Sequence, residues 1–299
     1  MYNGVCPVIN VPFNEDYSID FESLENEVEY VINSGCESIC LFAFNSEPYK
    51  LSFEEKTETI ERFLKCVDKR IETLVGIVEN SMSDCIILGK CARENGADGI
   101  IMYPPALSTP HGDALVEYFK TIAEAVDLPV MIQDNPRSTG VTMSLDMLLD
   151  AYKQIEQFNY IKVECPIPMR KLRAIVNKTD GELKCYSGNG GIFAIEAFLN
   201  GATGIMPGVL LCGEFNKMIN LFRKGEIGKA RDMFEKILPL AWYEDQSLEF
   251  YVSCEKYLLQ KLGIIKCDTA RKPCTPISDS EKSEVWLLYQ RMKKYIDSI

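Results

Sequence analysis

The stretch Tyr160-Ile161-Lys162-Val163-Glu164-Cys165 carries the pattern on which the fold and the chemistry of this chain depend. In an extended strand, side chains alternate between two faces. Ile161, Val163 and Cys165 therefore form an apolar face, while Lys162 and Glu164 share the other. A spacing of two residues separates these charged groups by about 7 Å along the strand. The pattern predicts a strand that holds an amine and a carboxylate on one side.

A lysine inside a protein has two interpretations. Removing an ammonium group from water disfavours its charged form, and a neutral amine is a nucleophile that condenses with a ketone or aldehyde to a Schiff base. Alternatively, Lys162 and Glu164 form an internal ion pair, or the strand lies at an exposed edge. The residue pattern alone leaves these interpretations open.

Strand-like and helix-like segments alternate outward from this stretch. Gly35, Gly96 and Gly201 each stand at the end of a helical segment, where a left-handed residue turns the chain into a strand. Eight alternations within residues 1–224 predict a closed (β/α)8 TIM barrel of the α/β class. The predicted strands are 4–13, 38–44, 74–78, 99–103, 128–134, 160–165, 184–187 and 203–206.

Strand signals end after residue 224, and residues 225–299 form a C-terminal extension. Three helices are expected there, at 226–238, 243–262 and 280–296, with a proline-containing linker at 271–276. We expect this three-helix extension to pack beside the catalytic barrel and to serve subunit contacts.

The composition limits the possible partners. The chain of 299 residues is 46% hydrophobic and carries a net charge of −12, which repels nucleic acid and anionic membrane surfaces. An apolar run long enough to span a membrane is absent from the sequence, and the start of the chain lacks a basic leader. The expectation is a cytoplasmic protein that binds a small molecule.

The cysteines and the single histidine argue against a metal centre. Twelve cysteines are scattered without a C-x-x-C motif, so we expect reduced thiols that pack as small apolar groups. His111 is the one histidine and lies in a loop rich in proline and serine, so sites built on several imidazoles are excluded. The sequence predicts neither a metal nor a cofactor.

Polar residues gather where strands of the predicted barrel end, which is where barrel enzymes hold their active sites. At any single strand, ordinary turn residues in a solvated loop would give the same pattern. Several such polar strand ends on one rim, together with an inward lysine, favour an active site. The candidates are Asn45, Ser46, Gln133, Arg137, Lys162, Glu164, Ser187 and Gly188.

These residues resemble a known family. Asn45-Ser46-Glu47 with Leu51-Ser52-x-x-Glu55, Pro136-x-x-Thr139-Gly140, Ile161-Lys162, Ser187-Gly188 and Gly201-Ala202-x-Gly204 follow one another as in the dihydrodipicolinate synthase and N-acetylneuraminate lyase superfamily. The resemblance covers essentially the whole chain. It implies a pyruvate-handling barrel in which Lys162 forms an imine with the keto carbon, residues 44–46 hold the carboxylate, and the subunits form a homodimer or homotetramer.

The chain departs from the family at several positions. The family's turn Gly-Thr-Thr-Gly-Glu or Gly-Ser-Thr-Gly-Glu reads Ala43-Phe44-Asn45-Ser46-Glu47 here. Its proton-relaying tyrosine corresponds to Gln133, whose amide is neither an acid nor a base near neutral pH. The tyrosine that crosses a subunit boundary corresponds to Leu107, and the substrate-binding arginine falls on Ser138 beside Arg137. A dihydrodipicolinate synthase activity is therefore not expected.

Glu164 is the candidate for proton transfer, with Gln133, Asn45, Ser46 and Arg137 positioning the substrate and Ser187 and Gly188 shaping the far wall. The Lys-x-Glu pattern resembles the branch that dehydrates 2-keto-3-deoxy sugar acids. We therefore expect a Schiff-base lyase for such an acid or a related 2-keto acid, acting by dehydration or retro-aldol cleavage.

Three alternatives remain open. The first is a pyruvate aldolase similar to the synthase or to N-acetylneuraminate lyase. The second is an enzyme whose loop at 187–191 holds a phosphate, and the third is a barrel that binds a 2-keto acid without catalysis.

Overall fold

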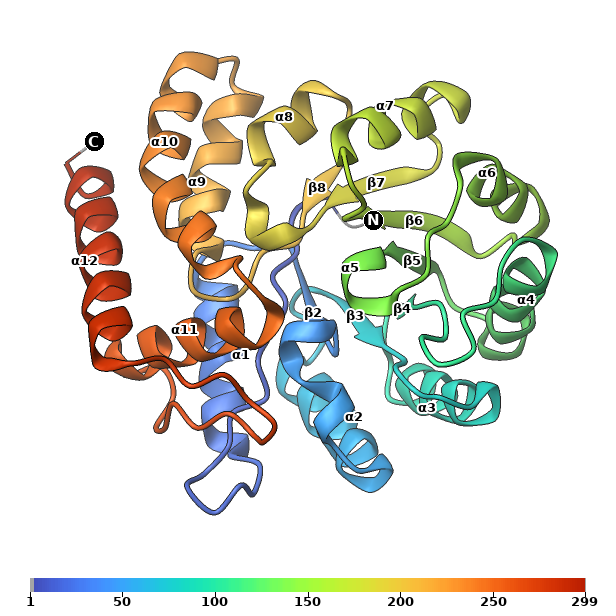
Figure 1. The fold of residues 1–299 in the computed structure, drawn as a ribbon, viewed down its shortest axis with the longest axis horizontal. Helices are drawn as coiled ribbons and strands as arrows, with labels where there is room; N and C mark the ends of the chain where they lie inside the picture. Colours follow the sequence, from blue (N-terminus) through green and yellow to red (C-terminus); the bar gives the residue numbers. More distant parts are fainter. Residues whose placement is uncertain (1–2, 299) are drawn as a thin grey trace.

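The computed structural model describes residues 3–298 as a barrel of eight parallel strands surrounded by helices (Figure 1). The strands are hydrogen-bonded in the order β1-β8-β7-β6-β5-β4-β3-β2. Val8 bridges both Cys40 and Gly208, which joins the first strand segment to the second and closes the sheet. The predicted (β/α)8 TIM barrel is confirmed. The strands are β1 (Gly4–Val5), β2 (Ser38–Leu41), β3 (Glu72–Gly76), β4 (Gly99–Met102), β5 (Val130–Asp134), β6 (Phe158–Val163), β7 (Lys184–Ser187) and β8 (Gly204–Ile205).

Helices connect successive strands and cover the outside of the barrel. Local capping fixes their starts: Ser52 accepts the N–H of Glu55 while the Glu55 side chain accepts the N–H of Ser52, the capping box expected from the sequence. The barrel helices are α1 (Phe21–Asn33), α2 (Phe53–Val67), α3 (Met82–Glu94), α4 (Asp113–Val126), α5 (Pro136–Thr139), α6 (Leu145–Gln154), α7 (Pro168–Lys178), α8 (Ala194–Leu199) and α9 (Cys212–Arg223), and the short 3₁₀ turns are η1 (Phe44–Ser46), η2 (Pro48–Lys50) and η3 (Asn189–Gly191).

The predicted boundaries differ from the structure at two informative places. The first strand is regular only at Gly4–Val5, because Pro7 and Pro12 have no N–H for a continuous ladder. β6 ends at Val163, so Glu164 follows the strand instead of belonging to it. Its N–H still donates to the carbonyl of Asp134 at 2.9 Å, which keeps Glu164 in line with β6.

The interior of the barrel is packed below the level of Lys162. Leu74, Ile101, Met131, Tyr160 and Tyr186, each from a different strand, belong to one buried cluster. Residues two positions further along a strand point the same way. The side chain after Tyr160 on this face is therefore that of Lys162, which lies above a closed apolar floor.

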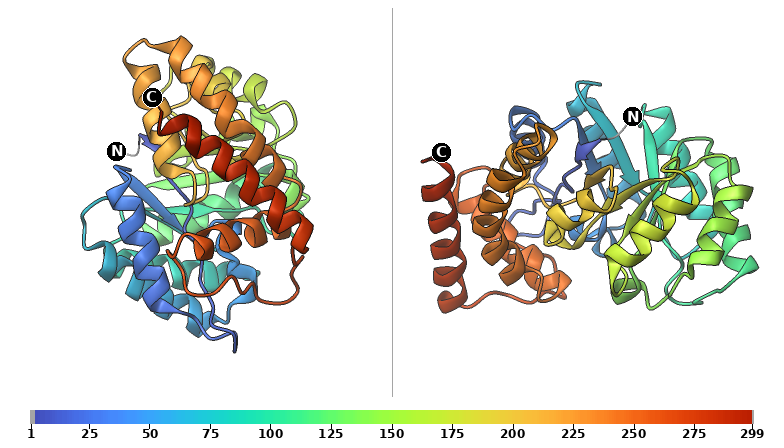
Figure 2. Two further views of the ribbon diagram at one scale, coloured as in Figure 1. Left: turned by 90° about the vertical axis from the view of Figure 1, so that its left-hand side faces the viewer. Right: turned by 90° about the horizontal axis from the view of Figure 1, so that it is seen from above.

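The C-terminal extension consists of α10 (Ile227–Glu244), α11 (Leu248–Lys261) and α12 (Asp279–Ile296). α10 packs against α9, and α12 packs against α10 (Figure 2). α11 lies against η1. The apolar residues of the C-terminal extension belong to the same buried cluster as those of the barrel helices. The three predicted helices are thus present, whereas the division into two domains at residue 224 stays a prediction.

All twelve cysteines are free thiols, as expected, and His111 is exposed in its loop. Within residues 3–298, no helix has the length and apolar character needed to cross a membrane.

Candidate active site

A pocket opens at the carboxyl ends of the strands, and both Lys162 and Glu164 line it. Its walls come from the segments that follow β2, β5, β6, β7 and β8, together with the start of α11. This is the end of a (β/α)8 barrel where catalytic groups are found. The inward lysine that the sequence predicts is therefore placed where a small molecule can reach it.

Lys162 lies on β6 between Gln133 of β5 and Tyr186 of β7. Only 4% of the residue is exposed, and its Nζ lies 3.5 Å from Oε1 of Glu164. This distance joins the two charges without a close hydrogen bond. The amine can therefore still hydrogen-bond to a ligand in the pocket or react with it.

The carboxylate of Glu164 is held from three sides. Gln133 Nε2 and Asn135 Nδ2 donate to Oε2, the latter at 3.0 Å, and the backbone N–H of Asn189 donates to Oε1 at 2.8 Å. A Cβ at Gly188 would overlap the Glu164 side chain, so glycine makes room for it. These contacts aim an acceptor-only carboxylate at the amine and fix its position.

The other predicted residues lie at different distances from this pair. Asn45 lines the pocket, whereas the Ser46 hydroxyl accepts the N–H of Phe42 at 3.0 Å and donates to a backbone carbonyl outside it. Arg137 lines the rim and donates to Asp245 at 3.2 Å. Ser187 is buried beside the pocket, and its Oγ has no hydrogen-bond partner among residues 3–298.

Four further residues with polar side chains line the pocket and were not among the predicted site residues. Asn135 and Asn189 donate to Glu164, while Asp245 and Tyr251 come from the C-terminal extension. The two asparagines lie in the loops after the fifth and seventh strands, where the sequence predicted that polar residues gather. Asp245 and Tyr251 carried no signal, because nothing local in a helical tail indicates that it reaches the mouth of a barrel.

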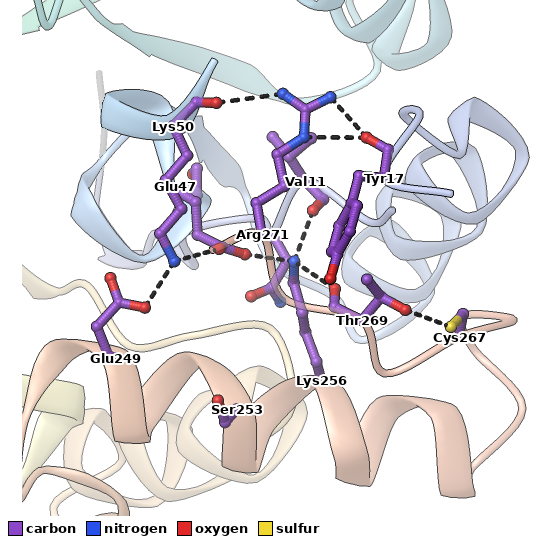
Figure 3. Close-up of polar contacts among 12 residues, drawn as sticks. Val11, Tyr17, Glu47, Lys50, Glu249, Ser253, Lys256, Cys267, Thr269 and Arg271 are labelled. Atoms are coloured by element: carbon purple, nitrogen blue, oxygen red, sulfur yellow. Dashed lines mark hydrogen bonds and ion pairs between the residues drawn. The ribbon is translucent and has the colours of Figure 1, made fainter. Parts of the chain in front are cut away.

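A second charged cluster fixes the turn that carries Asn45 (Figure 3). Glu47 accepts from Lys256 of α11 and from Lys50 at 2.7 Å, and Lys50 also pairs with Glu249 at 2.6 Å. Lys256 further donates to the carbonyl of Val11 at 2.8 Å. The extension is thus bonded directly to η1 and η2.

Buried carboxyl groups lie behind this turn. Burial raises the pKa of Glu255 to about 7 and that of Glu27 to about 8. Oε1 of Glu255 accepts the N–H of Leu210 at 3.0 Å, and Oε2 of Glu27 accepts the N–H of Asn10 at 3.0 Å. These groups carry protons into the neutral pH range.

Metal ligands are not gathered in this site. Across residues 3–298 there is no group of three or more His, Cys, Asp or Glu side chains placed to hold a metal ion. The polar side chains of the pocket instead provide an amine, two carboxylates, a guanidinium, amides, a hydroxyl and a phenol, which suit the binding of a small polar organic molecule.

Comparison with known proteins places this geometry in context. A family model for the dihydrodipicolinate synthetase family matches residues 1–291. A 4-hydroxy-tetrahydrodipicolinate synthase of Oceanobacillus iheyensis is 27% identical over 241 residues, covering 80% of this chain and 81% of that protein. An L-2-keto-3-deoxyarabonate dehydratase of Azospirillum brasilense is 24% identical over 296 residues, covering 97% and 94%.

Solved structures show the same fold. The dihydrodipicolinate synthase of Rhodopseudomonas palustris superimposes with a TM-score of 0.90 at 26% identity, covering 97% of each chain. The 4-hydroxy-tetrahydrodipicolinate synthase of Methylacidiphilum fumariolicum gives a TM-score of 0.93 at 23% identity, covering 100% of this chain and 98% of the other.

Proposed function

Because this chain belongs to the dihydrodipicolinate synthetase family, we propose that Lys162 forms a Schiff base with a 2-keto-3-deoxy sugar acid or related 2-keto acid and that Glu164 acts as the base. The membership confirms the expectation of a class I lyase. The substrate and the roles of individual residues belong to the proposal.

The observation that carries the proposal is the distance of 3.5 Å between Lys162 Nζ and Glu164 Oε1 inside the pocket. Once the amine has become an imine, C3 of the substrate is bonded to the imine carbon. A carboxylate fixed beside the nitrogen is then within reach of a proton on C3. Gln133 stands where the family has a proton-relaying tyrosine, and it donates to this carboxylate. The role of the base is therefore assigned to Glu164 and not to residue 133.

Dehydration follows from these two groups. The Lys162 amine attacks the keto carbon, water leaves, and the protonated imine makes the C3–H acidic. Glu164 takes the C3 proton, the C–H electron pair forms the enamine, and the electrons of the enamine then expel the hydroxyl group from C4. Hydrolysis of the conjugated imine returns the free lysine and a product that has lost one water.

The remaining pocket groups suit the polar ends of such a substrate. Asn45 and Arg137 offer N–H donors to a carboxylate or hydroxyl group. Gln133 Oε1 is buried and lacks a hydrogen-bond partner among residues 3–298, so it is available to accept from a substrate hydroxyl. Ser46, whose hydroxyl is engaged elsewhere, would contribute through the turn it stabilises, and Ser187 through the wall behind Glu164.

Retro-aldol cleavage is the second candidate, because the same carboxylate could take the proton of the C4 hydroxyl and break the C3–C4 bond. The relatives named as synthases favour carbon–carbon chemistry, whereas the relative named as an L-2-keto-3-deoxyarabonate dehydratase, aligned over 97% of this chain, favours loss of water. Product analysis separates these two reactions, since only cleavage releases pyruvate.

A phosphate site at 187–191 has less support. The N–H of Asn189 already donates to the Glu164 carboxylate, and a second anion there would be repelled. The homodimer or homotetramer that the family resemblance implies, and the cytoplasmic location expected from the sequence, stay predictions.

A substrate panel with borohydride tests the proposal. We expect reduction in the presence of pyruvate or a 2-keto-3-deoxy acid to fix the ligand covalently on Lys162. Glu164→Gln should still form this adduct, but its turnover should fall about 100-fold to 10,000-fold. A folded protein that binds 2-keto acids without any adduct would be a non-catalytic binding protein and would refute the proposal.

A further inference from the structure

The proposed dehydration needs a proton donor as well as a base. Glu164 removes a proton, but the hydroxyl group that leaves C4 must itself be protonated to depart as water. Apart from serine hydroxyls, the ionisable side chains that line the pocket besides Lys162 and Glu164 are Arg137, Asp245 and Tyr251. An arginine does not release its proton in proteins, so two candidates remain.

Asp245 is the weaker candidate. Its Oδ2 accepts from Arg137 at 3.2 Å, and its backbone carbonyl accepts from the same guanidinium at 2.8 Å. Burial raises the pKa of Asp245, but the adjacent guanidinium opposes this rise. The hydrogen bond from the guanidinium favours the charged form of Asp245 and occupies its Oδ2, which makes it the less suitable proton donor.

Tyr251 lies one turn into α11, with its ring between the loops that follow β7 and β8. Its hydroxyl oxygen accepts the N–H of Gly208 at 2.9 Å. A Cβ at Gly190 would lie 3.2 Å from Cε2 of the ring, so a larger residue there would crowd it. Both glycines line the pocket, and the phenol oxygen is therefore held at its wall.

The hydrogen bond from Gly208 leaves the phenol proton free. Within residues 3–298 the structure offers this proton no protein acceptor, and a hydroxyl that accepts from a backbone N–H can still donate to another atom. Burial also raises the pKa of Tyr251, which keeps the phenol protonated at neutral pH. The phenol of Tyr251 is therefore protonated, and the hydrogen bond from Gly208 fixes its oxygen.

We propose that Tyr251 is the general acid of this site, donating its proton to the oxygen that leaves the substrate. This inference rests on the proposed Schiff-base function and adds a catalytic residue from the C-terminal extension. In the step, Glu164 takes the C3 proton, the C4–O bond breaks with its electron pair on oxygen, and Tyr251 supplies the proton that completes the water. The proton on Glu164 then returns to the phenolate, so the protein ends in its starting state.

A tyrosine that merely anchors the loop at Gly208 would give a different result from a tyrosine that donates a proton. Glu164 and Lys162 suffice for imine formation and for exchange of the C3 proton with solvent. The acid is needed only when the hydroxyl leaves. The test therefore measures the borohydride adduct on Lys162, C3 hydrogen exchange in D2O and loss of water separately in Tyr251→Phe.

We expect Tyr251→Phe to keep the adduct and the C3 exchange within about threefold while dehydration falls about 100-fold or more. Incorporation of 3-fluorotyrosine at position 251 keeps a hydroxyl and should retain dehydration within about tenfold. Tyr257→Phe, which changes a partly buried tyrosine of the same helix outside the pocket, is the matched control and should match the wild type.

Three outcomes would overturn the inference. Dehydration by Tyr251→Phe at the wild-type rate would remove the acid role. Equal losses of adduct, exchange and dehydration would assign Tyr251 to positioning the loop. Retained activity in Tyr251→Phe with a loss in Asp245→Asn would transfer the role to Asp245. If the wild type itself forms neither adduct nor exchange, the proposed function fails first, and the acid role falls with it.

Discussion

Two buried lysine–glutamate pairs of this molecule differ in their hydrogen bonding and in their access to the pocket. Lys256 and Glu47 are both fully buried, bond closely to each other, and are supported by the carbonyl of Val11 and by Lys50. Lys162 and Glu164 lie 3.5 Å apart, border the pocket, and expose 5% and 7% of their side chains.

The comparison shows that burial alone does not make an amine reactive. Burial lowers the pKa of Lys256, and Glu47 opposes this change by favouring the charged form. The Lys256 ammonium donates to the Glu47 carboxylate and to two backbone carbonyls, and Lys256 does not border the pocket. At Lys162 the carboxylate is instead held by amide donors, so the amine stays available to a ligand.

The largest expected effect distinguishes the two amines chemically. Lys162→Ala should abolish the borohydride adduct and lower turnover by at least about 10,000-fold, because no other lysine among residues 3–298 lines the pocket. Mass spectrometry of the reduced wild-type protein should find the ligand on Lys162. An adduct on Lys256 would reverse the assignment of reactive and structural pairs. Unchanged circular dichroism of Lys162→Ala would exclude unfolding as the cause.

Removing the other amine should affect stability instead. Lys256→Met leaves Glu47 buried with a reduced set of partners, and breaking such a pair costs about 3–5 kcal/mol. Denaturant unfolding measures this loss, and the adduct on Lys162 should still form in the folded protein. Lys229→Met breaks an exposed pair with Glu226 and should change stability little. Equal stability of the two variants would show that the buried cluster is not structural.

The smallest expected effect concerns the carboxyl groups behind the Lys256 cluster. Glu27 has a pKa of about 8 in the folded protein against 4.5 ordinarily, so the folded state binds more protons between these values. Its contribution to stability is present below about pH 4.5 and is lost as the pH rises through about 8. The side chain of Glu27→Gln does not titrate. Between pH 5 and pH 9 the melting temperature of this variant should therefore fall by at least about 2 °C less than that of the wild type.

Thermal unfolding of the wild type and Glu27→Gln at both pH values measures this difference. Glu25→Gln on the exposed side of the same helix is the control and should retain the wild-type dependence. A Glu27→Gln protein with the full wild-type pH dependence would contradict a raised pKa at this carboxyl.

The sequence predicted the barrel because its signals are local. Alternating apolar segments mark the strands, and Gly35, Gly96 and Gly201 take φ values of 74°, 91° and 91° as expected where helix turns into strand. The helix α6 occupies the place between the fifth and sixth strands where the predicted alternation requires a helix, although the sequence did not predict its bounds. The inward direction of Lys162 followed from strand periodicity and is consistent with its place in the pocket.

What the sequence by itself determined is therefore the (β/α)8 fold, the family resemblance and the Lys-x-Glu pair, since each depends on residues close together in the chain. Only the tertiary structure decided that Asn135 and Asn189 hold Glu164, that Ser46 bonds away from the pocket, and that α11 brings Tyr251 to its wall. The physical reason is distance along the chain: Tyr251 and Gly208 are 43 residues apart, and packing of α11 against the barrel creates a contact that no local pattern encodes.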